Sequence, residues 1–388
     1  MTASSPGAVP LFDSYFLGGF ECSTHRRRDG RRLDLLAATR HDVLARQDYL
    51  ALQAHDIATV RDGVRWHLVE TAAGHYDWSS FLPMLQAARD TGTQVIWDLC
   101  HYGWPDGIDI WTPAFVERFA RFAGAVARLV RDETEGIPVY CPVNEISFWA
   151  WAGGDMKLFN PGTTRRGMEL KTQLVRAALA ATHAIRAEDP RARIVLVDPV
   201  INVVPKSPRT RRQAAHAQQA QFEAWDMIAG RLHGELGGDA DCLDIIGVNY
   251  YSNNQWVLRG PTIRHGDPRY KPFREILSET WQRYGRPLFV AETGAEGAHR
   301  APWLRYVCNE VFAALQAGVP VGGICLYPVT DYPGWANGRH CRTGLLGVSG
   351  TQGHREVDTE FAIELAAQQD RFRTLLAPLS SEGLRATG

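Results

Sequence analysis

The chain has 388 residues, of which 45% are hydrophobic and 22% charged, an ordinary composition for a globular protein. Its 42 basic and 43 acidic side chains leave a formal net charge of -1. This balance excludes a whole-molecule field that would attract nucleic acid or an anionic membrane surface. We therefore expect neither nucleic acid nor a membrane among the partners.

The N-terminal segment and the cysteines indicate the compartment. The first residues, MTASSPGAVPLFDSYF, contain no basic stretch followed by an apolar one, so they do not resemble a secretory signal. No window of the sequence approaches the roughly 18 consecutive apolar residues that a membrane span needs. The 7 cysteines are scattered, odd in number and without a CxxC pair, which favours reduced, buried thiols over disulfides or a zinc site. The sequence thus predicts a cytoplasmic protein.

Eight short apolar segments are the predicted strands. In chain order they span residues 16–23, 57–66, 93–101, 139–145, 193–200, 242–251, 287–294 and 322–329. Most are continuous apolar runs, as expected of parallel strands that are covered on both faces. No GxGxxG motif follows any of them and no GxxxxGK[ST] motif is present, so nucleotide-binding folds are disfavoured.

Segments of helical periodicity separate these strands. The clearest span residues 81–92, 113–133, 170–188, 303–318 and 361–376. Thr112 and Pro113 are typical of a helix start, and Asp189-Pro190 and Gly318 of helix ends. Eight strand–helix repeats without a Ser/Gly-rich linker predict an α/β fold, a single (β/α)8 TIM barrel domain over residues 1–388. We expect flexible ends at residues 1–14 and 379–388.

Two glutamates end predicted strands, where a barrel of this kind builds its active site. Glu145 ends the fourth strand and Glu292 the seventh. Cleavage of a glycosidic bond requires two such carboxylates: one protonates the leaving oxygen, and the other attacks the anomeric carbon or activates a water. The aromatic run Phe148–Trp151 beside Glu145 offers the apolar setting that raises the pKa of an acid. Arg61 and a tyrosine of the sixth strand are expected to keep Glu292 ionised.

The strand-end motifs resemble a known family. PVNE at 142–145, VAETG at 290–294, GVNYY at 247–251, HYGWP at 101–105 and VRDGVRW at 60–66 look like degenerate versions of motifs of the family 1 glycoside hydrolases, the retaining β-glucosidases and β-galactosidases. FNPG at 159–162 also resembles a loop of that family. The motifs follow one another in the family's order from the first strand to the eighth. The resemblance therefore covers most of the chain.

The resemblance implies a role for each matching residue. Glu145 would be the acid/base and Glu292 the nucleophile of a retaining β-glycosidase that needs no cofactor and no metal. Five residues would hold the substrate or the nucleophile: Asn144 at the sugar 2-hydroxyl, His101 at a neighbouring hydroxyl, Arg61 and Tyr251 beside Glu292, and Trp335 stacked on the sugar face. Alternation along the sixth strand sends only one of Tyr250 and Tyr251 inward, and the motif favours Tyr251.

Three departures from the family leave the glycone open. Tyr327-Pro328 stands where the family has Trp-Ser, and Gly334-Trp335 where it has Glu-Trp. The glutamine of the family's first strand has no counterpart here, since CSTHRRR at 22–28 occupies that neighbourhood. The expected partner is a small glycoside or an oligosaccharide, and the sequence does not indicate an oligomeric state.

Rival interpretations remain for the whole protein and for one loop. An endo-acting glycanase of the same clan, a transglycosylase and a non-hydrolytic sugar-binding barrel all share these features. The basic run RRRDGRR at 26–32 is typical of a solvated loop. Its place after the first strand also permits contact with an anionic substrate group.

Overall fold

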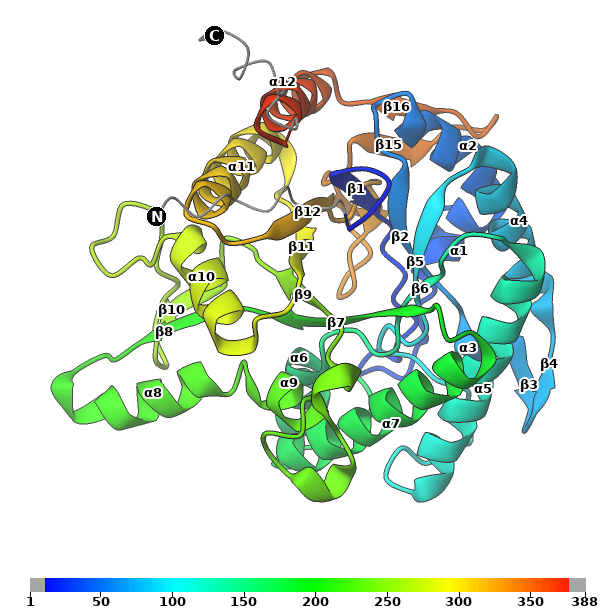
Figure 1. Cartoon of the computed structure of the whole chain (residues 1–388), viewed down its shortest axis with the longest axis horizontal. Helices are drawn as coiled ribbons and strands as arrows, with labels where there is room; N and C mark the ends of the chain where they lie inside the picture. The colour runs from blue at the N-terminus through cyan, green and yellow to red at the C-terminus, as the bar shows by residue number, and fades with distance from the viewer. Residues whose placement is uncertain (1–10, 377–388) are drawn as a thin grey trace, which may run out of the picture.

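The structure is a computed structural model that describes residues 11–376. Eight parallel strands close into a barrel in which each strand pairs with the next along the chain and the last pairs with the first (Figure 1). They are β1 (Phe16–Gly19), β2 (Thr59–Gly63), β5 (Gln94–Asp98), β6 (Val139–Cys141), β7 (Arg193–Pro199), β9 (Ile245–Asn249), β11 (Leu288–Thr293) and β12 (Val321–Leu326). Each overlaps one predicted strand, so the predicted TIM barrel is confirmed.

Helices surround the barrel on its outside (Figure 1). They are α1 (Leu35–Ala38), α2 (His41–Gln53), α3 (Trp66–Val69), α4 (Leu82–Thr91), α5 (Pro113–Glu133), α6 (Ile146–Trp149), α7 (Gly167–Glu188), α8 (Arg211–Gln219), α9 (Glu223–Ile228), α10 (Phe273–Tyr284), α11 (Arg300–Gln316) and α12 (Thr359–Leu376). α5 begins at Pro113, where the missing N–H costs nothing, and α4 ends before Gly92, whose φ of 65° suits a left-handed cap.

Four small two-stranded sheets lie in the loops. β3 (Glu70–Ala72) pairs with β4 (His75–Tyr76), β8 (Asn202–Val204) with β10 (Gln255–Val257), β13 (Tyr332–Pro333) with β14 (His340–Cys341), and β15 (Leu346–Ser349) with β16 (Arg355–Val357). The β13–β14 hairpin follows β12, so it extends from the end of the barrel at which the parallel strands finish. We call that end the barrel mouth.

Two apolar layers hold the barrel together. The larger lies between strands and helices; the smaller fills the barrel interior with side chains such as Leu17, Ile96 and Val197. Phe12 belongs to this inner layer, is 4% exposed and packs edge-on against Phe289 at 4.9 Å. The prediction of a flexible segment over residues 1–14 is therefore wrong at its end, because this apolar side chain is buried in the barrel. Residues 1–10 and the predicted tail at 379–388 lie outside the described residues.

The seven cysteines are all free and buried. Burial in apolar surroundings suits a reduced thiol, which then behaves as a small hydrophobic side chain. In residues 11–376, no helix combines the length and the apolar character that crossing a membrane requires.

Candidate active site

Arg61, on β2, is the hub of the barrel mouth. Its side chain is completely buried and bonds three other side chains and, at 3.4 Å, the Ala291 carbonyl. Two nitrogens donate to Asp98 at 3.0 and 2.7 Å, one donates to Glu292 at 2.7 Å, and one donates to the side-chain oxygen of Asn144 at 2.6 Å. The planar guanidinium allows this, since its donors leave in fixed and diverging directions. Arg61 thus fixes side chains of β5, β11 and the segment after β6 at one place.

Glu292 lies at the end of β11 with its carboxylate toward Arg61. The register of β11 against β9 shifts between Val290 and Glu292. Such an irregularity re-aims a side chain, and here it turns Glu292 inward directly after Ala291, which already faces the interior. One oxygen of Glu292 accepts from Arg61, and the other accepts from the Tyr251 hydroxyl at 3.0 Å. Each oxygen of Glu292 thus has a donor of its own, one cationic and one neutral.

Glu145 follows β6 in a very different setting. Its φ of 44° is left-handed, which is unusual for a side-chain-bearing residue and found mostly at functional sites. Its oxygens accept from the Asn249 amide at 2.8 Å and from the Tyr102 hydroxyl at 2.5 Å. Burial, and next the negative charge of Glu292, raise the pKa of Glu145 to about 8. A carboxyl of this kind is protonated at neutral pH.

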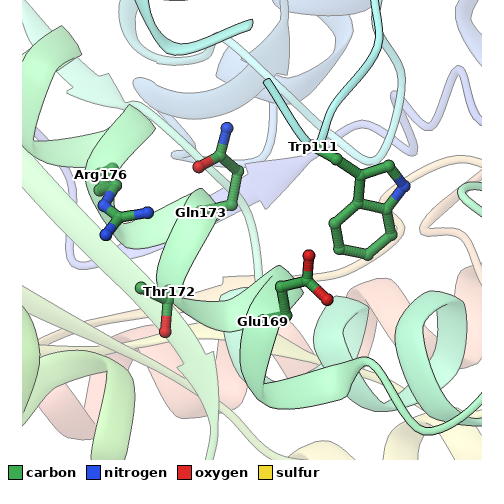
Figure 2. Close-up of a pocket in the computed structure, with 5 residues that line it drawn as sticks. All are labelled: Trp111, Glu169, Thr172, Gln173 and Arg176. Carbon is green, nitrogen blue, oxygen red and sulfur yellow. The ribbon is translucent and has the colours of Figure 1, made fainter. Parts of the chain in front are cut away.

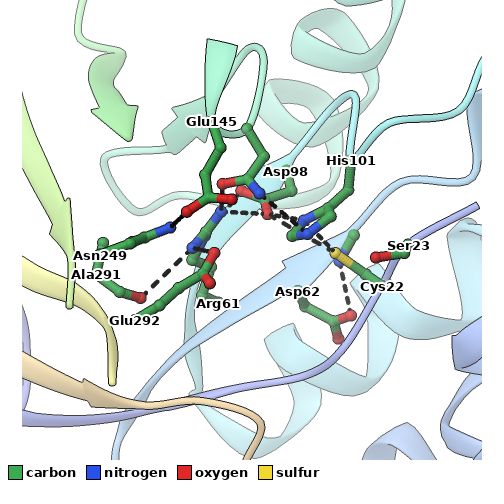
Figure 3. Close-up of polar contacts among 12 residues, drawn as sticks. Cys22, Ser23, Arg61, Asp62, Asp98, His101, Glu145, Asn249, Ala291 and Glu292 are labelled. Carbon is green, nitrogen blue, oxygen red and sulfur yellow. Dashed lines mark hydrogen bonds and ion pairs between the residues drawn. The ribbon is translucent and has the colours of Figure 1, made fainter. Parts of the chain in front are cut away.

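The two glutamates meet at the barrel mouth. Figure 3 shows both carboxylates directed toward the space beside the Arg61 guanidinium. Glu292 is paired with a cation, Arg61, whereas Glu145 has no cationic partner among the described residues. This is the division of roles that acid catalysis with a second, ionised carboxylate needs.

His101 and Asn144 are linked to the same network. The His101 ring contacts Asp98 through Nδ1 at 2.9 Å and Asn144 through Nε2 at 3.0 Å. Because Arg61 can only donate, the Asn144 oxygen faces Arg61 and its NH2 group faces His101 and the Tyr102 hydroxyl. Asn144 and His101 thus stand beside Glu145, with their amide and imidazole groups in the barrel mouth.

Tyr251 and Trp335, the remaining predicted substrate-binding residues, also lie at the barrel mouth, whereas Trp151 of the aromatic run does not. Tyr251 faces Glu292, whereas Tyr250 points outward and stacks on Phe273 at a centroid distance of 4.0 Å. Trp335 packs against Tyr102 at 5.7 Å. In the aromatic run, by contrast, Trp151 is 48% exposed.

The expectation that the whole run 148–151 surrounds Glu145 is therefore wrong at its last residue. The helix widens into a π-turn over residues 150–155 and carries Trp151 to the surface. Phe148 and Trp149 pack against Tyr102, at 5.8 and 5.7 Å.

Sequence reasoning missed several residues of the site. Tyr102 and Asn249 both bond Glu145, and Asp98 pairs with Arg61. Asn249 and Asp98 lie near the ends of the predicted strands 242–251 and 93–101, so their positions gave a usable signal. Tyr102 gave none, since its orientation depends on a left-handed backbone with φ of 67°. Glu21, a buried carboxylate after β1, was also missed.

One group of side chains at the mouth has the composition of a metal site. Cys22, Asp98 and His101 bring one ligand atom each within 4.8 Å of one another. The donor set does not suit a cation well, because both oxygens of Asp98 already accept from the Arg61 guanidinium. The Cys22 sulfur lies 3.2 Å from His101 Nδ1, which also contacts Asp98. We interpret the group as a hydrogen-bonded network that orients His101.

The basic run at 26–32 forms a closed loop. Arg26 and Arg32 both pair with Asp106, and Arg32 also donates to the Thr24 carbonyl at 2.9 Å. These ion pairs favour a structural role for the loop, since Arg26 and Arg32 already have a carboxylate partner.

A surface hollow lies apart from these residues. It has a volume of about 260 Å³ and is lined by Trp111, Glu169, Thr172, Gln173 and Arg176 (Figure 2). Four of the five belong to α7, on the outside of the barrel. The hollow contains none of the predicted site residues, so it contributes nothing to the carboxylate pair.

Comparison with known proteins agrees with the fold: the chain is a distant homologue of the family 1 β-glucosidases and β-galactosidases. A β-galactosidase of Sulfolobus acidocaldarius is 24% identical over 335 residues, covering 72% of this chain and 67% of that protein. The chloroplastic β-glucosidase-like SFR2 of Oryza sativa subsp. japonica is 24% identical over 312 residues. That alignment covers 71% of this chain and 45% of the rice protein, so the chain spans less than half of its length.

Solved structures share the fold. The family 1 β-glucosidase from Thermotoga maritima superposes with a TM-score of 0.75 at 15% identity, over 94% of this chain and 99% of that one. The same enzyme is also known in complex with glucoimidazole. No family model matches the chain. The two sequence relatives and the shared fold confirm the resemblance to family 1 as distant homology.

Proposed function

We propose that the protein is a retaining β-glycosidase in which Glu292 is the nucleophile and Glu145 the acid/base. The observation that carries the proposal is the contrast between two buried glutamates at one barrel mouth. Glu292 has a guanidinium and a phenol as partners, whereas Glu145 has a pKa raised to about 8. Distant homology to β-glucosidases and β-galactosidases supports the same activity.

The reaction would run in two displacements. Glu292 attacks the anomeric carbon while the bond to the leaving oxygen breaks, and that oxygen takes the proton of Glu145. A water then attacks the same carbon and gives its proton to Glu145, and the bond to Glu292 breaks. Asn144 would hold the 2-hydroxyl, His101 a neighbouring hydroxyl and Trp335 the sugar face. The seven buried, free cysteines support action in the cytoplasm.

The stereochemistry of the product tests this proposal. Aryl β-glycosides with different sugars are incubated with the protein, and the anomer formed first is recorded by proton NMR. Two displacements predict the β-anomer as the first product. The α-anomer as first product, or no hydrolysis of any β-glycoside, would contradict the proposal.

The pH dependence gives a further prediction. Since Glu145 must be protonated to act as acid and its pKa is raised to about 8, kcat/KM is expected to fall above about pH 8. Tyr102→Phe removes a hydrogen bond that favours the ionised form, so the basic limb should move upward. We expect a shift of about one pH unit, because a hydrogen bond to a charged group contributes about 1.5 kcal/mol.

A tyrosine outside the barrel provides the control. Tyr306→Phe removes a hydroxyl that bonds Tyr270 at 2.7 Å, away from the two glutamates. Its pH profile should match that of the wild type. A basic limb that stays in place or moves downward in Tyr102→Phe would show that the hydrogen bond does not act on the catalytic acid.

A further inference from the structure

Glu21 is a third glutamate at the barrel mouth, and the proposed mechanism does not use it. It lies two residues after β1, whose alternate residue Leu17 belongs to the inner layer. A Cβ atom on Gly19 would lie 2.2 Å from the Tyr327 ring, so position 19 also faces inward. Continued alternation directs Glu21 to the same side. The residue is 5% exposed.

Glu21 has no cationic partner within the described part of the chain. Its carboxylate accepts from the Ser23 backbone N–H at 3.1 Å and from the Ser23 hydroxyl. Asp48 and Glu310, by contrast, are paired with Arg355 and Arg274, each at 2.7 Å. An unpaired buried carboxylate is costly, and burial accordingly raises the pKa of Glu21. Its retention calls for a partner that arrives from outside.

Polar groups of the loops at the barrel mouth also lack partners. The Tyr327 hydroxyl, His25 Nδ1 and Trp335 Nε1 are buried and make no hydrogen bond. Tyr327 and Trp335 lie in the loop after β12, the strand that pairs with β1. The Tyr327 ring packs against Gly19 of β1, and burial, together with the charge of Glu21, raises the pKa of Tyr327. A ligand with several hydroxyl groups could form hydrogen bonds with buried polar atoms that lack a partner in the protein.

The enclosed charges at the mouth are unbalanced. With Glu145 protonated and Glu21 held ionised by a cationic ligand, three carboxylates, those of Glu21, Asp98 and Glu292, would share the mouth with one guanidinium, that of Arg61. Burial lowers the pKa of His101, but the hydrogen bond with Asp98 and the charges of Asp98, Glu21 and Glu292 together raise it above its ordinary value. A protonated ring would nevertheless present an N–H group to the Asn144 NH2 group at 3.0 Å, so the observed contact requires a neutral imidazole. Even an imidazolium would leave fewer cations than carboxylates.

This imbalance decides which sugars suit the site. An anionic glycone, such as a uronate or a sugar phosphate, would add a like charge to an enclosed negative site. A glycone that carries an ammonium group would supply the missing cation, with a charge-assisted hydrogen bond to a buried carboxylate. A neutral hydroxyl would donate a hydrogen bond to the carboxylate oxygens but would not neutralise the negative charge.

We propose that Glu21 is the glycone-recognition residue of this site and that the preferred glycone is an amino sugar whose ammonium group pairs with Glu21. The proposal rests on the proposed β-glycosidase function, in which Asn144 holds the 2-hydroxyl. The amino group is therefore at C3, C4 or C6. Tyr327 would bond a remaining hydroxyl of the same sugar.

Binding separates this proposal from the catalytic one, because it needs no turnover. Methyl β-D-glucoside, its 3-, 4- and 6-amino-deoxy analogues and methyl β-D-glucuronide are titrated into the protein by calorimetry at neutral pH. At least one amino analogue is expected to bind ten times or more tightly than the parent glucoside, and the glucuronide more weakly than either. In Glu21→Gln the advantage of the amino analogue over the parent glucoside should fall to less than threefold.

Two variants control the result. Glu296→Gln removes a negative charge that is partly exposed, paired with Arg339 and located just after β11. It should keep the preference for the amino analogue. Glu21→Asp keeps the charge and should retain part of the preference.

Each outcome bears on the proposal. Equal binding of parent and amino analogues by the wild-type protein overturns it, whether or not Glu21→Gln folds. A preference that survives in Glu21→Gln overturns it as well. If amino analogues bind through Glu21 but no aryl β-glycoside is cleaved, the β-glycosidase function fails and the recognition role of Glu21 stands.

Discussion

Glu292→Gln is expected to lower kcat/KM for aryl β-glycosides by on the order of 10⁴-fold or more. The amide has nearly the shape of the carboxylate but does not attack the anomeric carbon, and it loses the ion pair with Arg61 at 2.7 Å. The circular dichroism spectrum should stay close to that of the wild type. Steady-state kinetics on the best substrate of a glycoside panel measures the effect.

Glu296→Gln is the matched control for this substitution. Glu296 follows the same strand by a few residues but is paired with Arg339 at the surface. Its kcat/KM should stay within about twofold of the wild type, since exposed ion pairs contribute little. Activity of Glu292→Gln within tenfold of the wild type would exclude Glu292 as nucleophile.

Arg61→Met is expected to reduce the free energy of unfolding by about 3–5 kcal/mol, because it leaves buried carboxylates without their cation. Asp98 and Glu292 both lose a partner at 2.7 Å, and Asn144 loses a donor at 2.6 Å. Activity should be lost as well, since the nucleophile is no longer oriented. Urea unfolding followed by fluorescence measures the stability.

Two further variants serve as controls: Arg128→Met, which breaks a surface ion pair, and Arg61→Lys, which keeps the charge at position 61. Arg128→Met breaks an ion pair with Glu188, but the Arg128 side chain is 61% exposed, so we expect a loss of less than about 1 kcal/mol. Arg61→Lys keeps the charge but has three donors on one nitrogen in place of the five on a planar guanidinium, so its stability should lie between wild type and Arg61→Met. Equal stability of Arg61→Met and the wild type would show that the hub is not structural.

The barrel could be predicted from the sequence because its signals are local. Continuous apolar runs and the helical segments between them follow from burial on both faces of parallel strands. The predicted strands often extend past the true ones; the first was placed at 16–23 but ends at Gly19. Phe20 to Ser23 are buried without belonging to the barrel ladder, and burial alone does not reveal where pairing ends.

The site was partly predictable for a different reason. Strand-end motifs placed Glu145, Glu292, Arg61, Asn144 and His101 in one region, and the structure brings them together. That proximity follows from barrel topology, in which all strands end at one mouth.

The partners of the acid could not be predicted in this way. Left-handed φ angles at Glu145 and at Tyr102 direct these two side chains toward each other. The register shift in β11 likewise turns Glu292 inward after Ala291. Such local backbone features are set by tertiary packing, and one sequence does not display them.

Covalent labelling tests the central claim most directly. The protein is incubated with a panel of 2-deoxy-2-fluoro β-glycosides, including amino-deoxy members, and examined by intact mass and peptide mapping. Fluorine at C2 slows release of the glycosyl-enzyme, so we predict one added glycosyl group, attached to Glu292 and absent in Glu292→Gln. Attachment to another residue would contradict the assignment of the nucleophile. So would turnover of a β-glycoside by the wild type while none of its fluoro analogues labels the protein.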